Sequence, residues 1–174
     1  RPEILLMVMA AAMPIAFWTW VVLLNNFTVE VASFTGKEIG ILQSLREVPG
    51  FLSFLVVYLL LIIAEQRLAL LSLFILGVGV ALTGYFPTII GLYITTVISS
   101  IGFHYYEACH QSLSLQWLDK KTAPERMGLI YSVASVAKFL VLGAIFTVYL
   151  LSLPEISWQA LASSTGLATG LNSY

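Results

Sequence analysis

Five apolar stretches, each long enough to cross a membrane as a helix, constrain the fold of this chain more than any other feature. They cover residues 4–24, 39–64, 68–86, 88–117 and 127–151. A membrane-spanning helix needs about 20 mostly apolar residues. The chain is 59% apolar and only 10% charged, whereas about 25% of the residues of soluble domains are charged. We therefore predict an all-α membrane protein, a bundle of five to six transmembrane helices in the lipid bilayer.

The end of the sequence suggests part of one more helix. A mildly apolar stretch begins near Trp158 and runs to Tyr174, so we predict a partial sixth span there. Residues 1–174 would then form one transmembrane helical domain. Because the sequence begins with Arg-Pro-Glu rather than Met and stops within this mildly apolar stretch, we expect it to be a piece of a longer protein. The partner would then be a missing carboxy-terminal half or a second subunit.

The basic residues of the short loops predict the orientation in the membrane. Lysine and arginine are enriched in loops on the cytoplasmic side. A cytoplasmic N-terminus leaves only Lys37 in an outer loop. We therefore predict a multi-pass inner-membrane protein with its N-terminus inside. The basic residues then on the cytoplasmic side are Arg1, Arg67, Lys120, Lys121 and Arg126.

Charge and motifs argue against several other classes of protein. The net charge is −1, so no basic field is available for nucleic acid. Cys109 is the only cysteine, which excludes an internal disulfide and a multi-cysteine metal cluster. The sequence has no phosphate loop, Gly-x-Ser-x-Gly elbow or zinc-protease helix. We therefore expect neither an enzyme nor a resident cofactor.

Polar side chains of the fourth span gather on one side of the helix, within an arc of roughly 80° at about 100° per residue. They are Ser100, His104, Glu107, Gln111 and Ser114. An ionisable residue inside a span costs a few kcal/mol, so it usually faces a cavity or a partner. We predict that this polar stripe lines water or meets other polar helices. The neighbours expected mostly on other sides are Ile98, Ile101, Phe103 and Tyr106.

Charged groups also interrupt the second and fifth spans. Arg46 and Glu47 lie in the outer half of the second span, and Lys138 lies near the centre of the fifth, where Tyr131 shares its side. Arg46 and Lys138 are candidates to pair with Glu47 and Glu107. These charges suggest a polar cavity for a solute or for protons, or else ion pairs that hold the helices together.

The segment from His104 to His110 also invites a metal interpretation. Glu107 and His110 have the Glu-x-x-His spacing of di-iron bundles, which use two such motifs and further carboxylates. Only one motif is present, and the two histidines point about 120° apart on a helix. We therefore predict no metal site, and histidine suits a proton relay better.

The loop after the fourth span points to a known family. It reads Trp-Leu-Asp-Lys-Lys-Thr-Ala-Pro-Glu-Arg-Met-Gly over residues 117–128 and places Pro124, Arg126 and Gly128 in a Pro-x-Arg-x-Gly pattern. Together with the Ser157-Trp158 segment and the order of spans, it resembles the amino-terminal half of a major facilitator superfamily transporter, of a bacterial-type branch with unknown substrates.

This resemblance implies a six-helix domain that faces a second one across the substrate path, with the first and fourth helices lining that path. The implied function is secondary active transport of a small polar or charged solute by alternating access, with proton coupling through Glu107 or His104. The residues that we expect along the substrate or proton pathway are Glu107, His104, Gln111, Lys138, Arg46, Glu47, Ser100, Tyr131 and Trp18.

Two alternatives stay open at this point. The bundle could be a non-transporting subunit of a larger membrane complex, in which the charges are pairing devices. The second alternative is a membrane-embedded metal enzyme that uses His104, Glu107 and His110 on a lipid-soluble substrate.

Overall fold

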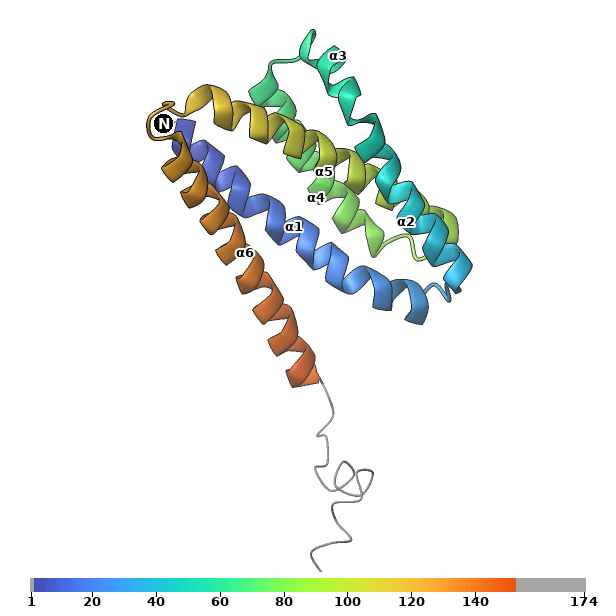
Figure 1. Cartoon of the computed structure of the whole chain (residues 1–174). Helices are drawn as coiled ribbons and strands as arrows, with labels where there is room; N and C mark the ends of the chain where they lie inside the picture. The colour runs from blue at the N-terminus through green and yellow to red at the C-terminus, as the bar shows by residue number, and fades with distance from the viewer. Residues whose placement is uncertain (1, 153–174) are drawn as a thin grey trace, which may run out of the picture. The chain divides into compact units, whose positions relative to one another are not determined.

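The computed structural model describes residues 2–152 and is helical throughout its regular structure (Figure 1). Five helices of this part are long and apolar enough to cross a membrane, which confirms the predicted all-α membrane fold class. The described residues fall into two units, which divide between Leu142 and Gly143. All contacts described below lie within the first unit. The predicted partial sixth span lies outside the described residues.

Four of the long helices coincide closely with predicted spans. They are α1 (Pro2–Glu30), α4 (Glu65–Thr83), α5 (Ile89–Trp117) and α6 (Ala123–Ser152). The first one extends six residues beyond the predicted end at 24, so the predicted loop of residues 25–38 is reduced to a short connection. The Thr28 hydroxyl supports this extension by donating a hydrogen bond to the carbonyl of Asn25 at 2.8 Å.

The second span is interrupted within its length. It consists of α2 (Gly36–Phe51), a 3-10 turn (Leu52–Leu55) and α3 (Val56–Leu60). Thr35 and Glu38 start α2 with a reciprocal capping box, which satisfies amide groups that have no helical partner. The regular helix passes through Pro49 and ends two residues later, at Phe51. Pro49 lacks an amide donor and its ring crowds the preceding turn, so it weakens the helix close to this end.

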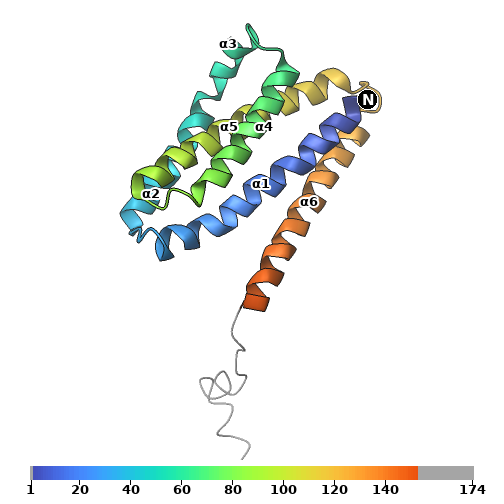
Figure 2. The same ribbon diagram turned by 180° about the vertical axis from the view of Figure 1, so that it is seen from behind.

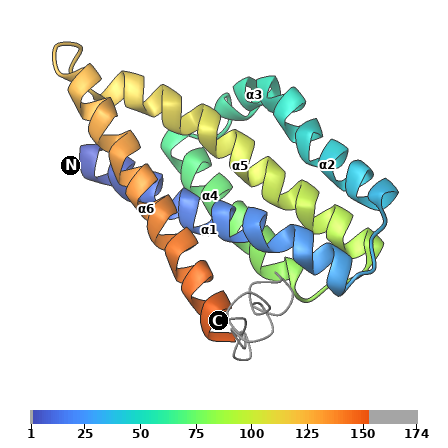
Figure 3. The ribbon, with the colours of Figure 1, turned by 60° about the horizontal axis from the view of Figure 1, so that its bottom comes forward.

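Helix α5 has the central position, in contact with α1, α2 and α4. Figure 3 shows α5 between α1 and α2, and Figure 2 shows α4 beside α1 and α5 from behind. Two glycines allow the close approach of α4 and α5. Gly79 lies against Ser99, and Gly102 lies against the backbone of Ser72 and Leu76. Small residues at such crossings are typical of helix packing in membranes.

Two apolar clusters lie at opposite ends of α1. One is centred on Leu6, Met9 and Tyr106, and the other on Trp20 and Leu42. Many large apolar side chains point outward instead, as the hydrocarbon of a bilayer allows. Along the polar stripe of α5, residues of α1, α2 and α6 line the same cavities as the stripe residues.

Candidate functional site

The polar stripe of α5 is divided between two cavities. Glu107, Gln111 and Ser114 line one cavity, whereas Ser100 and His104 line the other. The two groups share one side of a continuous helix, as predicted, but different helices cover them. The stripe was expected to line one polar pathway. In this structure it lines two separate cavities instead, one after the other along α1 and α5.

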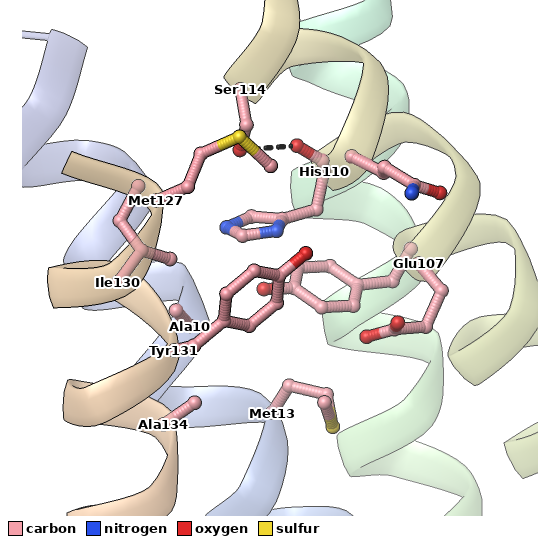
Figure 4. A pocket seen from close by; sticks show the side chains of 11 residues that line it. Ala10, Met13, Glu107, His110, Ser114, Met127, Ile130, Tyr131 and Ala134 are labelled. Carbon is pink, nitrogen blue, oxygen red and sulfur yellow. Dashed lines mark hydrogen bonds between the residues drawn. The ribbon is translucent and has the colours of Figure 1, made fainter. Parts of the chain in front are cut away.

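The Glu107 cavity has a volume of about 240 Å³ and walls from α1, α5 and α6 (Figure 4). Glu107 and Tyr131 reach it from α5 and α6, and both are exposed. Within residues 2–152, Glu107 forms no ion pair. Its carboxylate is therefore open to water or solute. The residues that line this cavity are Ala10, Met13, Tyr106, Glu107, His110, Gln111, Ser114, Met127, Ile130, Tyr131 and Ala134.

His110 is held in place at the wall of this cavity. Its Nε2 lies 3.1 Å from the carbonyl oxygen of Leu6, and its ring stacks on that of Tyr106 with 5.2 Å between centroids. Ser114 donates a hydrogen bond to the carbonyl of His110 at 2.8 Å, shown as the dashed line in Figure 4. The Tyr106 hydroxyl is buried and has no hydrogen-bond partner among the described residues.

The Arg46 cavity has a volume of about 250 Å³ and lies between α1, α2 and α5. Arg46 and Glu47 form an ion pair there, with 2.9 Å between Nη2 and Oε1 and 3.0 Å between Nε and Oε1. The predicted pairing of these two residues is thus present. The lining residues are Phe17, Trp18, Trp20, Val21, Arg46, Glu47, Ser100, Phe103 and His104.

The kinked part of α2 is joined to α5 at this cavity. The Ser100 hydroxyl donates a hydrogen bond to the carbonyl of Arg46, close to the turn that Pro49 disturbs. Hydroxyl side chains commonly satisfy backbone groups near such a proline in membrane helices. Gly50 leaves room for the imidazole of His104, because a Cβ atom there would lie only 2.7 Å from His104 Cε1.

Aromatic side chains form much of the wall of the Arg46 cavity. The rings of Phe17 and Phe103 stack with 4.1 Å between centroids and an interplanar angle of 14°. Trp20 is only 3% exposed, and its Nε1 has no hydrogen-bond partner among the described residues. A buried indole N–H without an acceptor is unfavourable, so a bound acceptor would stabilise it.

Lys138 does not make the ion pair with Glu107 that the sequence suggested. Its Nζ lies over the ring of Trp18, 3.5 Å from the centroid. An aromatic face attracts an ammonium group through its quadrupole and needs no carboxylate. Because Trp18 also lines the Arg46 cavity, the Lys138 contact lies beside that cavity and not at Glu107.

Two aromatic residues outside the polar arc of α5 also line the cavities, which the sequence did not predict. Phe103 lines the Arg46 cavity and Tyr106 lines the Glu107 cavity. Phe103 lies only about 20° outside the polar arc on a helix of 100° per residue, so its position at a cavity could have been predicted from the sequence. Tyr106 lies farther round, and only the neighbouring helices turn its position into a cavity wall.

No metal centre is present in the described part of the chain, where no group of three or more His, Cys, Asp and Glu side chains could hold an ion. His104 and His110 lie in different cavities. Comparisons with protein families, curated proteins and solved structures find no match to this chain.

Proposed function

We propose that this chain is one helical bundle of a secondary active transporter, which moves a small polar or charged solute by alternating access. The observation that carries the proposal is the pair of cavities of about 240 and 250 Å³ on the same two helices, α1 and α5. They contain Glu107, Arg46, Glu47 and His104, all inside helices long enough to cross a membrane. Ionisable residues inside a membrane raise the free energy of the folded protein, and they commonly mark solute or proton paths.

The arrangement of the helices supports a relationship to the amino-terminal half of major facilitator transporters. In the resemblance drawn from the sequence, the first and fourth spans line the path. Here α1 and α5, which correspond to these spans, contribute to both cavities. Alternating access requires two bundles that rock against each other around the site, so a second half or a second subunit completes the transporter. The proposed location is the inner membrane, with the N-terminus in the cytoplasm.

We assign proton coupling to Glu107. Its carboxylate is exposed at a cavity and has no ion-pair partner within residues 2–152. A carboxylate engaged in a buried pair would be needed for stability, and loss of its charge would cost several kcal/mol. An exposed group outside such a pair can be neutralised at a cost of about 0.5 kcal/mol or less. This freedom favours a titrating role over the pairing role that a non-transporting subunit requires.

The test compares Glu107→Gln with Glu125→Gln, a matched change of an exposed glutamate outside both cavities. The protein, purified with any partner that remains bound, is reconstituted in vesicles that contain a pH-sensitive dye. Amino acids, organic acids, sugars and amines are added in turn. We expect at least one solute to drive proton movement with the wild type and with Glu125→Gln, but not with Glu107→Gln.

Thermal melting of the same variants separates the coupling role from a structural one. Both glutamine variants are expected to melt within about 2 °C of the wild type, given a cost of about 0.5 kcal/mol or less. Proton movement that persists in Glu107→Gln would contradict the coupling role. A large loss of melting temperature in that variant alone would favour the pairing role instead.

A further inference from the structure

The Arg46 cavity has charge of both signs and a net charge of zero from its ion pair. Arg46 and Glu47 both line it, and their side chains are 31% and 62% exposed. The pair is therefore accessible from the cavity, and each partner can exchange the other for a group on a solute. A solute with only one charge would satisfy one partner and leave the other without its counter-ion, which is unfavourable inside a membrane.

A second observation at this cavity points to a ligand with an acceptor group. Trp20 lines the cavity and is 97% buried, yet its Nε1 donor has no partner among the described residues. The indole N–H can only donate. A carboxylate placed between this N–H and the guanidinium of Arg46 would satisfy both groups, because guanidinium and carboxylate form two parallel hydrogen bonds.

The rest of the wall suits an ammonium group. Phe17, Trp18 and Phe103 present aromatic rings beside Glu47, and aromatic faces attract cations. The Trp18 ring already holds the ammonium group of Lys138 at 3.5 Å, so the ammonium of a solute would lie beside Glu47 and the rings of Phe17 and Phe103. Glu47, once separated from Arg46, supplies the counter-charge.

The size of the cavity limits the solute. A volume of about 250 Å³ corresponds to about eight water molecules at ~30 Å³ each. This is the bulk of a small metabolite. On the basis of the transport role above, we propose that the Arg46 cavity binds a small zwitterion, with its carboxylate at Arg46 and Trp20 and its ammonium at Glu47 and the aromatic wall.

Calorimetric titration of the purified full protein tests this site directly. The zwitterions are L-alanine, L-valine and glycine betaine. The matched controls are 3-methylbutanoate, which is L-valine without its ammonium, and 2-methylpropylamine, which is L-valine without its carboxylate. We expect at least one zwitterion to bind at least about tenfold more tightly than either control, the effect of one charged hydrogen bond. Equal binding of a control, or no binding by any zwitterion, overturns the proposal.

Variants connect the binding to the cavity. Trp20→Phe removes the indole donor and is matched by Trp117→Phe, a change outside both cavities. We expect zwitterion binding to weaken by about tenfold in the first variant only. Glu47→Gln leaves the cavity with a net positive charge, so it should bind 3-methylbutanoate more tightly than the wild type does. This gain cannot arise from misfolding, and its absence overturns the charge assignment.

The zwitterion site and the transport role fail in different ways. If a zwitterion binds but does not cross vesicle membranes, the transport role is wrong and the site stands. If 3-methylbutanoate crosses while zwitterions neither bind nor cross, the transport role stands and the site assignment is wrong.

Discussion

The crossing of α4 and α5 at Gly102 allows a stability prediction whose size follows from the structure. A Cβ atom at Gly102 would lie nearest to the backbone nitrogen of Leu76, 2.7 Å from the carbonyl oxygen of Ser72 and 2.8 Å from the Cα of Leu76. Ordinary contacts begin at 3.4 Å, so Gly102→Ala requires the helices to separate by at least about 0.7 Å. All three obstacles are backbone atoms, which no change of side-chain rotamer can move aside.

The expected cost is about 2 kcal/mol. Overpacking costs about 1–3 kcal/mol, and a gap of this size removes roughly a quarter or more of the dispersion energy of each atom pair. The better helix propensity of alanine returns up to about 1 kcal/mol. For a chain of this length, about 2 kcal/mol corresponds to a melting temperature that is lower by about 4–8 °C.

Gly77→Ala is the matched control, since it lies on α4 near the same crossing but has no atom within 4 Å of its added Cβ. Its melting temperature should equal or slightly exceed that of the wild type. Fluorescence-detected melting of the detergent-solubilised protein measures both variants. If Gly102→Ala melts as high as Gly77→Ala, the close approach of α4 and α5 is wrong, and with it the placement of the stripe against α1 and α2.

Two further predictions concern topology and Lys138. With the N-terminus inside, Ser33→Cys should react with a membrane-impermeant maleimide in intact cells and Thr122→Cys should not. The native Cys109 is 1% exposed and should stay unlabelled in both variants. Labelling of Thr122→Cys but not of Ser33→Cys would overturn the predicted orientation. Lys138→Gln should lower the melting temperature by about 1–8 °C, given about 0.5–2 kcal/mol for a cation–π contact. In a Trp18→Leu background the same change should have little further effect, and an undiminished effect there would exclude the cation–π contact as its cause.

The helices could be predicted from the sequence because each one is determined locally. A run of about 20 apolar residues satisfies its own backbone hydrogen bonds in lipid as a helix. The helices at residues 4–24 and 88–117 could therefore be predicted without knowing which segments lie beside them. The predicted and observed helix ends differ where a cap or a turn interrupts the apolar pattern. The capping box at Thr35 starts α2 three residues before the predicted position, and a 3-10 turn at Leu52–Leu55 interrupts the regular helix inside the predicted span.

The polar stripe was also determined by the sequence, since the angular position of a residue on a helix follows from its number alone. What the stripe faces depends on residues far away in the chain, and only the tertiary structure decided it. His104 and Glu107 are three residues apart, a rise of about 4.5 Å, yet the first lines a cavity shared with α2 and the second a cavity shared with α6. In the same way, Lys138 was recognisable as a charge within a span, but its partner was not, because the electrostatics of its surroundings depend on which helix lies opposite. In the structure Lys138 of α6 lies over the ring of Trp18 of α1, while the carboxylate of Glu107 remains open to its cavity.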